Sequence, residues 1–218
     1  MMSVDESKKI ANFIRNNNIV EINLMGGEFF CNPDWFDIYS NLISATKHAR
    51  IVSNSDWANN MGVKVKLASL VSIFGDKIYF SLSKDKWHTN KYVDLAAAYL
   101  KEIGARYLIA TEDETTDASI VPIGRAHYQY IGGIYDMFGC YCQSPKNMYS
   151  FLIDENGDIY KCSFGVSKYA NVDEYQDGGF AERFKEYNKR FYKIFIPSCR
   201  KCVTSFALQA SDRMVKTD

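Results

Sequence analysis

The chain has 218 residues, 47% of them hydrophobic, and its 26 lysines and arginines are balanced by 26 aspartates and glutamates. This length and apolar content predict one large domain, or a medium domain with a small appendage, and exclude extensive disorder. Zero net charge offers no electrostatic footprint for DNA or RNA, so a general nucleic-acid binder is excluded. The polar first residues and the short apolar runs are typical of neither a secretory signal nor a membrane span, so we expect a cytoplasmic protein.

Two periodicities alternate along the first 125 residues. The segments with helical spacing of apolar residues are 8–17, 32–49, 65–75 and 91–104. The segments expected to form strands are 19–25, 50–54, 77–83, 106–111 and, as a further candidate, 118–124. This alternation predicts βαβ units on a parallel sheet, either an open doubly wound sheet or part of a barrel. In both architectures ligands lie beyond the carboxyl ends of the strands.

The alternation ends near residue 132, and we expect a first domain over 1–136 and a second over 137–218. In the second, residues 150–164 alternate around Glu-Asn-Gly and predict a β-hairpin, and residues 180–195 are polar and aromatic with helical spacing. The predicted fold is therefore α/β with parallel strands, followed by a small cysteine-rich domain of hairpin and helix.

Five of the six cysteines fall in the last 79 residues. In a reducing compartment, clustered cysteines indicate metal ligands more than disulfides, and Cys199-x-x-Cys202 is a knuckle that can bind one metal. Four thiolates from a loop, the hairpin and the knuckle would close a tetrahedral zinc site or hold an iron–sulfur cluster. The alternative is a set of ordinary buried cysteines. The candidate ligands are Cys142, Cys162, Cys199 and Cys202, with Cys140 as an alternative to Cys142.

Gly26-Gly27-Glu28 follows a predicted strand directly. The two glycines are compatible with a plain tight turn. They are also compatible with a bare backbone edge against which a ligand's charged group lies, with Glu28 as the hydrogen-bond acceptor.

A second polar group follows the strand predicted at 77–83. Ser81, Ser83 and Asp85 supply hydroxyls and a carboxylate that suit ribose, although a polar loop with helix caps explains them equally well. The histidines make no spacing pattern, and we interpret them as structural or surface residues: His48, His88 and His127. Arg125 is compatible with a carboxylate ligand, but a surface arginine is the default interpretation.

Four segments in order, "INLMGGEFFCNPDWFDIY", "RIVSN", "IYFSLSKDKWH" and "IVPIGRA", resemble the radical S-adenosylmethionine (radical SAM) superfamily. The resemblance covers roughly residues 8–205 and implies a partial (β/α) barrel. The tail "FLIDENGDIYKCSF…PSCRKC" is similar to the twitch or SPASM-type extension of peptide- and protein-modifying members. There, Gly157-x4-Cys162 followed by CxxC matches an element that helps to ligate an auxiliary 4Fe–4S cluster.

The resemblance also implies roles for individual residues. Gly26, Gly27 and Glu28 match the element that holds the methionine amino group of S-adenosylmethionine. Ser53-Asn54 matches a usual Ser/Thr-Asn-Gly, and here Ser55 stands in place of the glycine.

Near the ribose, Ser81 and Ser83 match a Ser-x-Asp strand end, with serine in place of the aspartate and Asp85 as a compensating carboxylate. Cys142 (or Cys140), Cys162, Cys199 and Cys202 match the auxiliary-cluster ligands. Zinc at these cysteines is the alternative metal.

One departure from the family pattern concerns the catalytic cluster. The family holds it on CxxxCxxC between the first strand and the first helix, whereas the sequence here begins at about that helix and contains no such motif. A cluster that leaves one iron open to the cofactor needs three thiolates, and Cys31 is a single one. We therefore expect no reductive cleavage of S-adenosylmethionine by this chain alone.

Three hypotheses follow. In the first, an N-terminal segment or partner supplies the missing cysteines, and a 5′-deoxyadenosyl radical abstracts hydrogen from a peptide or protein. In the second, the chain is a pseudoenzyme that binds a ligand or a protein. In the third, it is a zinc-stabilised interaction module in which Gly26-Gly27-Glu28 has no special role.

Overall fold

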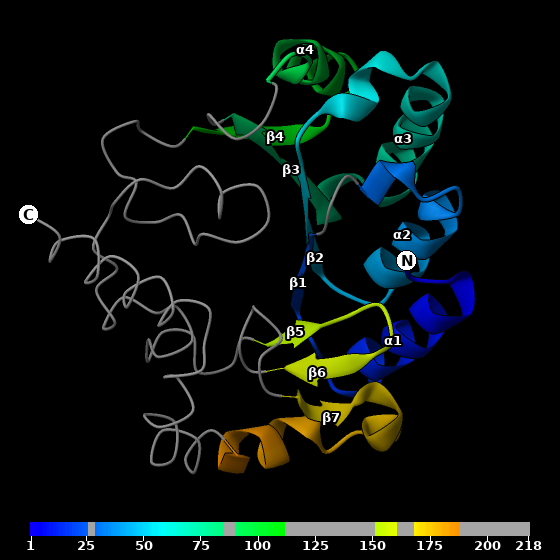
Figure 1. The fold of residues 1–218 in the computed structure, drawn as a ribbon, viewed down its shortest axis with the longest axis vertical. Coiled ribbons are helices and arrows are strands. Elements are labelled where there is room, and N and C mark those ends of the chain that lie inside the picture. The colour runs from blue at the N-terminus through cyan, green and yellow to red at the C-terminus, as the bar shows by residue number, and fades with distance from the viewer. Residues whose placement is uncertain (26–28, 85–89, 112–150, 161–167, 188–218) are drawn as a thin grey trace, which may run out of the picture. The chain divides into compact units, whose positions relative to one another are not determined.

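The structure, a computed structural model, contains two compact units. The residues that it describes are 1–25, 29–84, 90–111, 151–160 and 168–187 (Figure 1). The first unit comprises residues 1–112, 155–157 and 172–178. The second unit comprises residues 113–154, 158–171 and 179–218. The domain boundary predicted after residue 136 lies outside the described residues.

The described part of the first unit contains a four-stranded parallel sheet. Its strands are β1 (Glu21–Leu24), β2 (His48–Ser53), β3 (Ile78–Lys84) and β4 (Arg106–Thr111). Their order across the sheet is their order along the chain, and every neighbouring pair is parallel. The predicted α/β fold with parallel strands is therefore confirmed.

A helix precedes each of these strands in the chain. The helices are α1 (Val4–Asn16), α2 (Trp35–Ser44), α3 (Met61–Phe74) and α4 (Val93–Glu102). Figure 1 shows them along one side of the sheet, where α1 packs on α2 and α2 on α3. Within the described ranges, none of the helices combines the length and the apolar character that a membrane crossing needs.

The first helix begins earlier than the predicted segment 8–17. Ser3 caps it, because its Oγ accepts a hydrogen bond of 3.1 Å from the backbone N–H of Glu6. A serine cap satisfies one of the amide groups that the first turn leaves without a helical partner. The helix then buries Ile10, Phe13 and Ile14, which the periodicity had placed on its apolar side.

Alternation along the strands gives the sheet two faces. The helix-covered face is apolar and buried, and its residues in β2 and β3 include Ala49, Ile51, Ile78, Phe80 and Leu82. Side chains between these positions project to the opposite side, because successive strand residues alternate. We call this side the polar face, and its residues include Arg50, Tyr79, Ser81, Ser83 and Arg106.

An aromatic cluster holds the chain shortly after β1. Phe30, in the short helix η1 (Phe29–Cys31), is buried, and its ring centre lies 4.9 Å from that of Trp35 and 5.6 Å from that of Trp57. The nearly perpendicular contact with Trp35 is a favoured aromatic geometry. These contacts fix η1 against the first residue of α2.

The helix predicted over 32–49 is shorter, because α2 ends at Ser44. The Thr46 hydroxyl donates to the backbone carbonyl of Val20 at 2.7 Å, and the backbone N–H of His48 donates to the same carbonyl. The chain is thereby bound alongside the start of β1, and β2 begins at His48 rather than at residue 50. Periodicity alone did not predict this stop, because the tertiary hydrogen bonds decide it.

Amide side chains attach a late segment to the first helix. Asn17 Nδ2 donates to the carbonyl of Phe13 at 2.9 Å and to that of Tyr175 at 2.8 Å. Gln176 Nε2 donates in return to the carbonyl of Lys9 at 3.3 Å, and Lys9 Nζ lies 3.8 Å from a carboxylate oxygen of Asp173. Residues 172–178 therefore complete the first unit although they lie far along the chain.

The second unit contains an antiparallel sheet in its described part. Its strands are β5 (Leu152–Ile153), β6 (Asp158–Tyr160) and β7 (Lys168–Asn171). The hairpin predicted around Glu-Asn-Gly is thus confirmed. A hydrogen bond from Lys168, and to a smaller extent one from Asn171, holds the pKa of the Asp158 carboxyl below its ordinary value. The ion pair between Asp158 in β6 and Lys168 in β7 is therefore present at neutral pH.

Aromatic rings form the core of this small sheet. The rings of Phe180 and Phe184 stack with centres 4.9 Å apart, Phe151 lies 4.8 Å from Phe180, and Tyr169 lies 5.4 Å from Phe184. Phe180 and Phe184 lie one helical turn apart in a helix described over 180–187, as the spacing in this segment predicted.

Replacing Asn17 with aspartate should weaken the attachment of residues 172–178 to α1. A carboxylate cannot donate to the carbonyls of Phe13 and Tyr175 and would be repelled by them, which should lower the free energy of unfolding by about 1–2 kcal/mol. Urea unfolding followed by tryptophan fluorescence measures the change.

The matched control for this variant is Asn12→Asp on the same helix. Asn12 only accepts a hydrogen bond, from Arg15 at 2.8 Å, and a carboxylate can keep it. Equal losses of stability in the two variants would contradict the attachment through Asn17.

Candidate functional site

The carboxyl ends of β1, β2 and β3 lie at one edge of the sheet, because the strands are parallel. Four of the predicted cofactor residues are described, and all lie at or near this edge: Ser53, Asn54, Ser81 and Ser83. The other four lie outside the described residues and follow β1 or β3 closely in the chain: Gly26, Gly27, Glu28 and Asp85.

The structure separates Ser53 from the other two serines. Ser53 is level with Leu82 in the sheet, so it lies on the helix-covered face, whereas Ser81 and Ser83 lie on the polar face. Its Oγ is buried and accepts a hydrogen bond of 2.9 Å from the backbone N–H of Ser55. Ser53 therefore stabilises the turn after β2.

The turn after β2 has a glycine-like backbone at a serine. Asn54 Oδ1 accepts from the backbone N–H of Asp56 at 3.0 Å, which closes a local turn. Ser55 then takes φ of 74°, in the left-handed region that glycine tolerates and other residues rarely adopt. Its side chain is fully buried, and the hydroxyl has no hydrogen-bond partner in the part of the chain that the structure describes.

Ser81 and Ser83 have different surroundings on the polar face. Ser81 is buried, and its Oγ accepts a hydrogen bond of 2.9 Å from Arg50 Nη2. Ser83 lies two residues closer to the carboxyl edge and is half-buried, and its hydroxyl makes no hydrogen bond with another described residue. Of the two hydroxyls, that of Ser83 is the better placed to meet a ligand.

The predicted metal ligands lie outside the described residues: Cys140, Cys142, Cys162, Cys199 and Cys202. The same holds for His88, His127 and Arg125. Cys31, in η1, is an exposed free thiol. In the part of the chain that the structure describes, no three His, Cys, Asp or Glu side chains gather in a way that could hold a metal ion.

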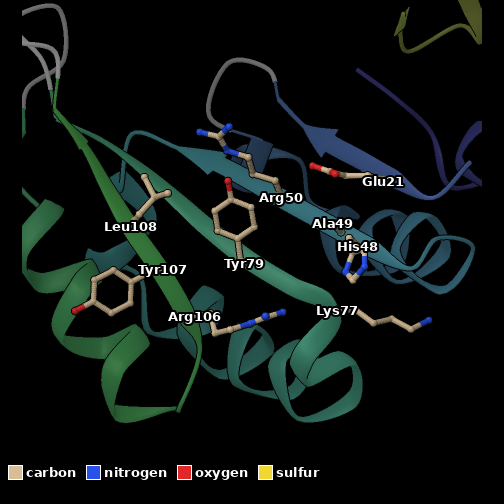
Figure 2. Close-up of a pocket in the computed structure, with 9 residues that line it drawn as sticks. All are labelled: Glu21, His48, Ala49, Arg50, Lys77, Tyr79, Arg106, Tyr107 and Leu108. Atoms are coloured by element: carbon tan, nitrogen blue, oxygen red, sulfur yellow. The ribbon is translucent and has the colours of Figure 1, made fainter. Parts of the chain in front are cut away.

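A pocket on the polar face was not predicted. It has a volume of about 360 Å³ and lies towards the amino-terminal ends of the strands (Figure 2). Its lining residues are Glu21, His48, Ala49, Arg50, Lys77, Tyr79, Arg106, Tyr107 and Leu108. The one signal in the sequence is a basic residue at or just before the start of β2, β3 and β4, and only the strand register brings these residues together.

No protein-family model, curated protein or solved structure matches this chain. The resemblance to the radical SAM superfamily therefore rests on the residues of the chain itself.

Replacing Ser55 with glycine should stabilise the protein. Glycine adopts φ near +74° without a Cβ clash, and the change removes a buried hydroxyl that no described residue binds. The two gains should outweigh the extra chain entropy of glycine and raise the free energy of unfolding by about 1 kcal/mol. Chemical denaturation measures the change.

Ser55→Ala separates the two contributions, because alanine keeps the Cβ in the left-handed backbone but lacks the hydroxyl. We expect the free energy of unfolding of Ser55→Ala to lie between that of the wild type and that of the glycine variant. A glycine variant less stable than the wild type would show that the left-handed turn is not under strain.

Proposed function

We propose that this chain is a radical SAM-like protein that binds S-adenosylmethionine at the carboxyl edge of its parallel sheet. The observation that carries the proposal is the turn Ser53-Asn54-Ser55, which follows β2 directly and reaches φ of 74° at Ser55. At this position the resemblance expects glycine, the residue that this backbone favours. Ser55 thus has a backbone conformation that suits glycine, the residue that the family usually has at this position.

The order of the strands supports a partial (β/α) barrel rather than a doubly wound sheet. In β1–β4 each strand is added beside the one before it, and α1–α4 lie along one side (Figure 1). A doubly wound sheet reverses its strand order at a switch point and carries helices on both faces. A barrel instead adds strands in sequence with its helices outside, which is the pattern of the described strands.

The described residues fit a ligand that carries ribose hydroxyls. Ser83 is half-buried on the polar face near the carboxyl edge, where its hydroxyl can both donate and accept. Ser81 accepts from Arg50 and still has its own proton to donate. Ser53 is assigned to the turn rather than to ligand contact, because its Oγ is already bound to the Ser55 N–H.

Gly26, Gly27 and Glu28 would hold the amino group of the cofactor. They link the end of β1 to η1, which the Phe30 cluster anchors. A glutamate carboxylate forms a charge-assisted hydrogen bond with an ammonium group, which is stronger than a neutral one.

The proposal assigns binding to this chain and not cleavage. The 218 residues contain no CxxxCxxC, and an open catalytic cluster needs three thiolates. Reductive cleavage would require those thiolates from another polypeptide segment, and without them the chain is a binding pseudoenzyme. When bound, S-adenosylmethionine supplies a one-electron-cleavable carbon–sulfur bond.

The C-terminal cysteines complete the proposal. Cys142 (or Cys140), Cys162, Cys199 and Cys202 would ligate an auxiliary 4Fe–4S cluster, and the surrounding domain would receive a peptide or protein. The hairpin supports this ligand set, since Cys162 comes two residues after the end of β6 in the chain. The alternative is a zinc-stabilised interaction module at the same cysteines.

Calorimetric titration of the anaerobically purified full chain with S-adenosylmethionine tests the pocket. We expect saturable binding that Glu28→Gln weakens by roughly tenfold or more, because a charge-assisted hydrogen bond is lost. Glu102→Gln, at the exposed end of α4, is the matched control and should bind like the wild type. Absence of saturable binding, or equal affinities in the two variants, would refute the proposed site.

Metal analysis tests the cysteine domain separately. After anaerobic purification and reconstitution we expect about four irons per chain, with matching sulfide, and loss of the cluster in Cys202→Ser. Cys31→Ser, at the exposed thiol, should keep the full iron content. One tightly bound zinc with no iron would instead favour the interaction module.

A further inference from the structure

We propose a second site, for a small anion, in the pocket on the polar face near the amino-terminal ends of the strands. The ligand is a phosphate or carboxylate group, either free or carried by a small organic molecule. This pocket differs from the proposed cofactor site, since its lining residues lie in or just before the first halves of the strands, whereas the cofactor residues lie nearer the carboxyl edge. The hydrogen bond between Arg50 and Ser81 joins the two groups of residues.

Strand register places the two arginines on the same face of the sheet. Arg50 is level with Tyr79, and Tyr79 is level with Arg106, so the two arginines flank the tyrosine in one cross-strand row. Neighbouring strands lie roughly 5 Å apart, which places the starting points of the two arginine side chains about 10 Å apart. Figure 2 shows Arg50 and Tyr79 projecting from neighbouring strands on the pocket side.

The pocket concentrates positive charge in a protein whose net charge is zero. Arg50, Lys77 and Arg106 line it with three basic side chains, and Glu21 is the one carboxylate among its lining residues. No ion pair joins any of these three cations to a carboxylate of a described residue. Lys77 and Arg106 instead donate to the backbone carbonyls of Thr46 and Asp76.

Arg50 is the central residue of the site. Its Nη2 donates to Ser81, and its guanidinium carbon lies 5.5 Å from the centre of the Tyr79 ring. Its Nε is buried and has no hydrogen-bond partner among the described residues. A buried donor without a partner carries a desolvation cost that an anion would remove. Arginine also presents planar pairs of N–H groups that match phosphate and carboxylate.

The chemistry of the lining restricts the ligand. Three cations without an ion pair to a described carboxylate attract an anion, while the ring of Tyr79 and the side chain of Leu108 offer apolar contact beside it. A volume of about 360 Å³ admits a small metabolite but not a folded partner.

Isothermal titration of the full chain at constant ionic strength tests the site with two probes, inorganic phosphate and citrate. We expect saturable binding of at least one probe, and a loss of affinity of about tenfold or more in Arg106→Gln, which removes an exposed cation without touching the core. Arg50→Gln should lose as much, and Glu21→Gln should bind more tightly. Phosphate binding alone would identify the phosphate group as the ligand, and citrate alone the carboxylate.

The matched control is Arg15→Gln, an exposed arginine in the last turn of α1. It should bind like the wild type. Circular dichroism checks that each variant is folded. If Arg50→Gln does not fold, the affinity of Arg106→Gln alone tests the proposed site. Failure of both probes to bind saturably, or an Arg106 variant that binds as tightly as the Arg15 control, would overturn the proposal.

Discussion

The parallel register of four strands in chain order is the constraint on which the rest of the first unit depends. It directs all strand starts to one edge of the sheet and all strand ends to the other. Residues separated by some 25–30 positions in the chain, such as Arg50 and Tyr79, become direct neighbours as a result. The hydroxyls of β3 and the cations at the strand starts thus lie on the same face of the sheet, at different positions along the strands.

Much of the fold could be predicted from the sequence, because the two periodicities are local properties. β4 begins and ends as the apolar run 106–111 predicts, and the hairpin forms around Glu-Asn-Gly. Predictions were wrong where side chains act at a distance. Thr46 binds the carbonyl of Val20 and ends α2 early, and no pattern within residues 32–49 contains that information.

The candidate site could be predicted only in part. Position near a strand end is visible in the sequence, and the structure has Ser53 at the end of β2 and Ser83 one residue before the end of β3. Which face each serine occupies depends on the register between β2 and β3, and this separates Ser53 from Ser81 and Ser83. The basic pocket was missed for the same reason, because Arg50 and Arg106 become neighbours of Tyr79 only through pairing.

The first unit is discontinuous in the chain, since Tyr175 and Gln176 are bound to α1. During synthesis α1 leaves the ribosome long before the segment that completes its surroundings. Contacts of such sequence separation carry a high loop-closure entropy and form late. The nascent protein must therefore hold an incomplete first unit, with α1 lacking its final neighbours, until most of the second unit has been translated.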